Sequence, residues 1–174
     1  MKTKVILSAV GSDRPGLTQA LAEAVHEAGG NWLESHLSRL GGTYVGSVLV
    51  EIDEEAVARL SEAVGKVDSG GLHVSLAPAG DAGEASGYPL SIEVVGQDRP
   101  GIVRQVTAVL AKLGVNIEDF SSSARQGPYF GEPIFTALVK ARVPEEVAFD
   151  EVQSALEAIS GEIMVDLTIS HQDN

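Results

Sequence analysis

The chain has 174 residues and no cysteine, and its formal net charge of −13 comes from 12 Lys and Arg against 25 Asp and Glu. The lack of cysteine excludes disulfides, thiol catalysis and cysteine-based metal sites. The acidic surface, with no basic cluster to offset it, argues against direct contact with nucleic acid. The start is apolar only from Val5 to Leu7, too short for a signal peptide or a membrane span, so we expect a soluble cytoplasmic protein.

The first predicted elements are a strand and a helix. Residues 4–10 are mostly apolar and rich in β-branched side chains, which is typical of a buried strand. Apolar residues then recur at helical spacing over 17–28. We expect Asp13 to cap the start of this helix and Gly29-Gly30 to end it.

A hairpin, a helix and a strand follow. Two strands, 31–40 and 43–52, flank Gly41-Gly42, which is a typical two-residue hairpin turn. Apolar residues over 57–64 indicate a short amphipathic helix, and 72–77 form a closing strand. The order β-α-β-β-α-β predicts an α+β fold of the ferredoxin-like type.

The same order is predicted again after a linker. Residues 79–87 are rich in Gly and Ala and have no large apolar side chain, so we expect domains at 1–78 and 88–174. The second copy is predicted from a strand before Gly96, a helix over 102–113, strands over 115–124 and 133–143, a helix over 149–159 and a strand over 163–169.

One motif occurs in both copies. Gly11-Ser-Asp-Arg-Pro-Gly-Leu17 matches Gly96-Gln-Asp-Arg-Pro-Gly-Ile102, and at the same offset of 98 − 13 = 85 Gly29-Gly30-Asn31 matches Gly114-Val115-Asn116. From Gly11 to Glu34, 7 of 24 residues are identical, all in the loops at the helix ends. This period indicates tandem domains.

The motif has a ligand-binding interpretation and a structural one. N–H groups at a helix start carry partial positive charge and bind carboxylates, and Gly16 and Gly101 lack a Cβ that would keep a ligand away. Asn31 and Asn116 offer amide donors and acceptors. The same residue types are also common in ordinary turns and at helix ends, and from the residues alone both interpretations stay open.

A second feature is the long connection from Arg125 to Glu132. Tyr129 and Phe130 within it are candidates for contact with a protein partner, and packing over the second core is an equal alternative. The four histidines share no metal-site spacing with carboxylates, and no dinucleotide fingerprint or P-loop occurs. We therefore expect no catalytic residue, no metal and no cofactor.

Each half resembles the ACT domain, and the pair resembles the glycine cleavage system transcriptional repressor family. The resemblance is carried by Asp13-Arg-Pro-Gly-Leu17 with Gly29-Gly30-Asn31, by Asp98-Arg-Pro-Gly-Ile102 with Gly114-Val115-Asn116-Ile117, and by Gly131-Glu-Pro-Ile-Phe135. It implies ligand contacts, commonly across a domain interface, at Asp13, Gly16, Leu17, Asn31, Asp98, Gly101, Ile102 and Asn116.

The resemblance implies an amino-acid-sensing, allosteric regulator of transcription that responds to glycine or another small amino acid. It would act by contact with a protein partner and not with DNA or a membrane. One alternative is a structural adaptor that binds no ligand, and another is a detached regulatory subunit of an amino-acid or one-carbon enzyme. A small phosphatase that uses Arg14 and Arg99 is a third, and a homodimer is left open.

Overall fold

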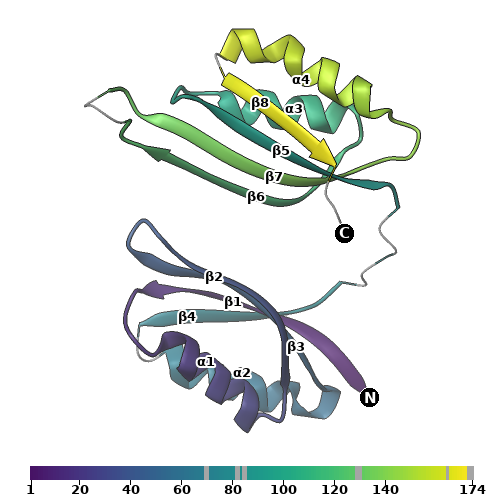
Figure 1. The fold of residues 1–174 in the computed structure, drawn as a ribbon. Coiled ribbons are helices and arrows are strands. Elements are labelled where there is room, and N and C mark those ends of the chain that lie inside the picture. The colour runs from purple at the N-terminus through teal and green to yellow at the C-terminus, as the bar shows by residue number, and fades with distance from the viewer. Residues whose placement is uncertain (69–70, 81–82, 84–85, 128–130, 164, 172–174) are drawn as a thin grey trace. The chain divides into compact units, whose positions relative to one another are not determined.

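The computed structural model describes residues 1–68, 71–80, 83, 86–127, 131–163 and 165–171 (Figure 1). The chain divides into two compact units, residues 1–81 and 82–174, so the division falls inside the segment 79–87. Each unit is a four-stranded antiparallel sheet with two helices on one face (Figure 1). The predicted pair of ferredoxin-like α+β domains is confirmed.

Unit 1 has the predicted β-α-β-β-α-β order. Its elements are β1 (Lys2–Ser12), α1 (Leu17–Glu27), β2 (Asn31–Leu40), β3 (Thr43–Asp53), a 3-10 turn (Glu54–Ala56), α2 (Val57–Asp68) and β4 (Leu72–Pro78). The strands lie in the order β2-β3-β1-β4. Gly41 and Gly42 have φ of 59° and 83°, the left-handed pair that a tight hairpin turn requires, which confirms the predicted turn.

Unit 2 repeats this topology. Its elements are β5 (Tyr88–Gln97), α3 (Ile102–Lys112), β6 (Asn116–Arg125), β7 (Ile134–Val143), α4 (Phe149–Ile163) and β8 (Val165–His171), with strand order β6-β7-β5-β8. At Ile163 the type of element differs from the prediction, because this residue ends α4 and does not begin the last strand. Apolar residues at 163, 165, 167 and 169 alternate, but helix hydrogen bonding extends through the first of them.

The cores lie between each sheet and its helices. Val5, Leu7 and Ala9 of β1 alternate inward, and Leu90, Ile92 and Val94 of β5 repeat the pattern. Fully burying one such Val, Leu or Ile side chain contributes about 1.5–3 kcal/mol. The first strand and first helix of each unit are therefore fixed firmly, and the turn between them is positioned by the core. Among the described residues, no helix is both long and apolar enough to cross a membrane.

Candidate ligand-binding turns

The repeated motif forms the turn between the first strand and the first helix of each unit. Gly16 (φ 89°) and Gly101 (φ 101°) are the N-cap residues of α1 and α3, in the left-handed region that favours glycine. No side chain hydrogen-bonds to either helix start, so the prediction that Asp13 caps α1 is wrong. A Cβ added at either glycine would meet nothing within 4 Å. The space beside both N-cap glycines is therefore open, and the first N–H groups of each helix have no partner within the helix.

The carboxylate of Asp13 has a different partner. Arg39 Nε, near the end of β2, lies 3.1 Å from Asp13 Oδ2. Arg39 was not among the residues predicted for this site. The signal that could have found it is the hairpin register, because Leu40 pairs with Thr43, which pairs with Ser12, and this brings the end of β2 level with the turn.

The second turn has other contacts. Arg99 Nη2 donates to Gln97 Oε1 at 3.0 Å, and the backbone N–H of Asp98 donates to the carbonyl oxygen of Pro133 at 2.8 Å. Within the described part of the chain, the carboxylate of Asp98 makes no hydrogen bond or ion pair. Its negative charge is therefore available to a ligand.

Two of the predicted ligand residues belong to the core. The side chains of Leu17 and Ile102 are each only 3% exposed and pack beneath the helices. Only their backbone N–H groups are placed to meet a ligand at the turn.

Asn31 and Asn116 lie far from the turn of their own unit. Asn31 pairs with Glu51, and Glu51 pairs with Lys4, whereas the turn follows Ser12. The separation along the sheet is 12 − 4 = 8 residues, or roughly 26 Å at 3.3 Å per residue. Unit 2 repeats this geometry, since Asn116 pairs with Arg142 and Arg142 with Pro89. One small amino acid cannot touch the turn and the Asn of the same unit.

The helix exit before Asn31 has its own anchor, which sequence reasoning missed. Arg59 of α2 donates from Nη2 and Nε to the carbonyl oxygen of Ala28, at 2.8 and 3.3 Å. Gly29 follows with φ of 77° and Gly114 is its counterpart with φ of 67°, as expected for glycines that end a helix.

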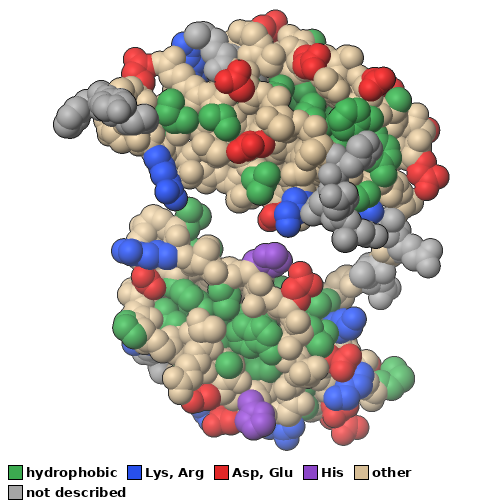
Figure 2. Space-filling view, in the orientation of Figure 1, with side chains coloured by type: hydrophobic (Ala, Val, Ile, Leu, Met, Phe, Trp, Pro, Cys, Tyr) green, Lys and Arg blue, Asp and Glu red, His purple; other side chains and the backbone are tan. Residues whose placement is uncertain are grey.

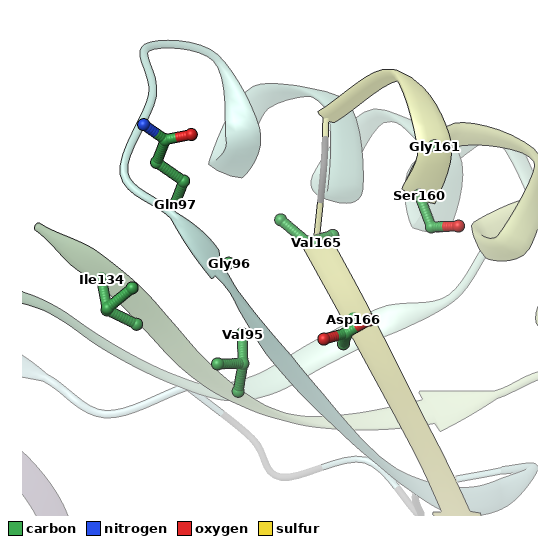
Figure 3. Close-up of a pocket in the computed structure, with 8 residues that line it drawn as sticks. All are labelled: Val95, Gly96, Gln97, Ile134, Ser160, Gly161, Val165 and Asp166. Carbon is green, nitrogen blue, oxygen red and sulfur yellow. The ribbon is translucent and has the colours of Figure 1, made fainter. Parts of the chain in front are cut away.

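A hollow of about 510 Å³ adjoins the second turn (Figure 3). Gly96 and Gln97, which directly precede Asp98, form part of its lining, and the β8 end of the hollow carries Asp166. In Figure 3, Gln97 projects from the end of β5 on one side of the sheet, whereas Val95 and Asp166 project to the other side. The full lining is Val95, Gly96, Gln97, Ile134, Ser160, Gly161, Val165 and Asp166.

The surface is mixed in charge. On the face drawn in Figure 2, acidic side chains are scattered over both units and the basic ones are interspersed with them. The predicted partner residues Tyr129 and Phe130 lie outside the described residues.

The fold and the two glycine turns define the class of the protein, a duplicated ferredoxin-like module. Two family models for the ACT domain match the chain, one over residues 3–74 and the other over residues 90–157. The chain therefore belongs to the ACT-domain family and carries one ACT domain in each unit.

Individual relatives agree with this assignment. An 84-residue stretch is 38% identical to a UPF0237 protein of Methanosarcina mazei, over 47% of this chain and 84% of that protein. A solved structure of an unknown protein from Galdieria sulphuraria is 26% identical over 99% of this chain and 100% of its own, with a TM-score of 0.87. A proposed glycine cleavage system transcriptional repressor has the same fold, at 19% identity, a TM-score of 0.72, and coverage of 100% and 99%.

Proposed function

We propose that this chain is an allosteric regulatory protein of the cytoplasm, without catalytic activity, that binds a small amino acid at its glycine turns. The observation that carries the proposal is the second turn, where an unpaired carboxylate at Asp98 stands three residues before the uncapped start of α3 at Gly101. A zwitterionic amino acid has one group for each of these. Its carboxylate accepts hydrogen bonds from the helix N–H groups, and its ammonium group pairs with Asp98.

The bare backbone at the turns fits the part that all amino acids share. Gly16 and Gly101 present bare backbone, so the α-carboxylate and α-ammonium of an amino acid supply the main contacts. The likeness in fold to a proposed glycine cleavage system repressor makes glycine the first ligand to test. The same likeness leads us to propose that the partner is a protein that regulates transcription. The net charge of −13 disfavours direct contact between this chain and DNA.

The asparagines give the proposal its mechanism. Asn31 and Asn116 can reach a ligand only at the turn of another ACT domain, which a second copy of the chain would supply. The ligand then favours the associated arrangement, because only that arrangement offers both the turn and the amide. The changed surface is what the partner recognises.

Calorimetric titration of the full chain with glycine, followed by serine and the other amino acids, tests this function. We expect saturable binding that weakens in Asn31→Ala and in Asn116→Ala. Ser38→Ala, an exposed substitution on the same sheet as Asn31, is the control and should bind like the wild type. If none of the amino acids binds, the sensor function is wrong, and a structural adaptor without a ligand replaces it.

A further inference from the structure

We infer that the two turns are not equivalent, because Arg39 holds the carboxylate of the first turn and leaves the second turn as the one that a ligand ammonium group occupies first. This inference rests on the proposed function. It assigns Arg39 as a positioning residue that sets which of the two turns responds at low ligand concentration.

Three tethers from three parts of unit 1 converge on the first turn. Arg39 Nε lies 3.1 Å from Asp13 Oδ2. At the first turn of α1, the hydroxyls of Thr18 and Tyr44 share a hydrogen bond of 2.8 Å. The backbone N–H of Ser12 donates to the carbonyl oxygen of Gly71 at 3.2 Å. The carboxylate, the helix start and the strand end are thus each fixed by a separate element.

The second turn has lost the side-chain tethers. At the offset of 85, Ala124 stands in place of Arg39 and Val103 in place of Thr18. Phe135 replaces Tyr44, since Tyr44 pairs with Gly11 and Phe135 with Gly96. None of these three side chains can donate a hydrogen bond or carry a positive charge. The carboxylate of Asp98, which is exposed, therefore keeps its negative charge open to a ligand ammonium group.

Space alone does not distinguish the two turns. Arg14 of the first turn lines a hollow of about 340 Å³, and Gly96 and Gln97 beside the second turn line one of about 510 Å³. The last strand of each sheet pairs with the corresponding glycine, Leu72 with Gly11 and Val165 with Gly96. The difference between the turns therefore lies in their side chains.

The size of the effect follows from the exposure of the ion pair. The Arg39 side chain is 69% exposed and that of Asp13 is 37% exposed, so the pair is screened by solvent. Displacing such a surface pair changes an equilibrium constant by about two- to fivefold. We therefore expect the first turn to bind an amino acid about two- to fivefold more weakly than the second turn.

Site-resolved NMR titration of the full chain with glycine tests the inference. The backbone amides of Gly16 and Gly101 report the two turns separately. We expect the Gly101 signal to reach half-saturation first. Arg39→Gln should bring the Gly16 midpoint down about two- to fivefold, whereas Arg39→Lys, which keeps the charge, should hold it near the wild-type value. Joint saturation of both signals in the wild type, or no change in Arg39→Gln, would overturn the inference.

A second measurement separates this inference from the proposed function. In the ligand-free protein, Asp13→Asn should shift the Arg39 Nε–H resonance, because the negative charge 3.1 Å away is lost. An unchanged resonance means that Arg39 does not hold the turn, whatever binds. A shifted resonance together with no response to any amino acid keeps the Arg39–Asp13 pair and refutes the sensor function.

Discussion

The end of the first helix shows how far the two units have diverged. In unit 1, Arg59 donates two hydrogen bonds to the carbonyl oxygen of Ala28. In unit 2, the ring of Pro144 occupies the corresponding place, with its Cγ 3.6 Å from where a Cβ on Gly114 would lie. In unit 2, an arginine forms an ion pair on the sheet instead, where Arg142 Nε lies 2.7 Å from Glu118 Oε1.

This difference shows which contacts the duplicated fold requires. The glycines with positive φ recur at matching positions, at 16 and 101 and at 29 and 114, because no other residue adopts that backbone without strain. The side chains around them differ, since a hydrogen bond at one position can be replaced by apolar packing at another. The backbone of the turns is therefore shared, and the chemistry beside them is particular to each unit.

The largest expected effect tests the part that the units share. Leu7→Ala and Ile92→Ala, which are equivalent and fully buried, should each lower the free energy of unfolding by about 2–5 kcal/mol, because each leaves a cavity. Urea denaturation of each variant, followed by circular dichroism, measures this. A loss below about 1 kcal/mol in only one unit would show that its core is looser than that of its twin.

The turn glycines should come next. Gly16→Ala and Gly101→Ala force a left-handed backbone on a residue with a Cβ, at a cost of about 1–2 kcal/mol each. Space is not the cause, since nothing lies within 4 Å of the added Cβ. Gly65→Ala, at a helical glycine that also has open space around it, is the matched control, and should be neutral or stabilising. Equal melting temperatures for all three variants would contradict the backbone argument.

Removing the arginine anchor should affect only unit 1. Arg59→Met keeps the aliphatic stem but removes both hydrogen bonds to Ala28, and we expect a loss of about 1–2 kcal/mol. Arg104→Met on the exposed surface of α3 is the control and should change the stability by less than about 0.5 kcal/mol. If both variants lose the same amount, the Arg59 contact has no specific role.

The smallest effect is a pH dependence particular to unit 2. Burial, and then the charge of Glu151, raise the pKa of Tyr88, whose hydroxyl donates to the carbonyl oxygen of Val147 at 3.0 Å. The folded-state pKa of Tyr88 lies above the ordinary value of 10.0. The stabilisation of the fold by the protonated hydroxyl is therefore complete below pH 10 and is lost as the pH rises through the folded-state pKa. Tyr88→Phe should therefore be less stable than the wild type at pH 8, and the gap should shrink at higher pH. A gap that is constant with pH would contradict the assignment.

Local patterns in the sequence were enough to predict the fold. Alternating apolar residues indicated the strands, and paired glycines at 29–30 and 41–42 indicated a helix end and a hairpin. These signals are local, so they can be recognised without any knowledge of how the chain packs. The helix start at Gly16 was predicted less well, because Asp13 is a good cap by type but its carboxylate reaches Arg39 across the hairpin.

The candidate site could be predicted only in part. The motif located the two turns, and the offset of 85 related them. A distance across the sheet depends on how strands that are far apart in the sequence pair with one another. The sequence therefore did not show that Asn31 lies about 26 Å from its own turn. The anchors Arg39 and Arg59 were missed for the same reason, since each contacts a residue at least 26 positions away in the chain.

The central claim is that an amino acid binds between the Asp98 carboxylate and the first N–H groups of α3. A crystal structure of the full chain grown with saturating glycine tests it most directly. We predict density for glycine at this turn, with its ammonium nitrogen within hydrogen-bond distance of Asp98 and its carboxylate facing Ile102. An empty second turn at a concentration where calorimetry shows saturation would contradict the claim.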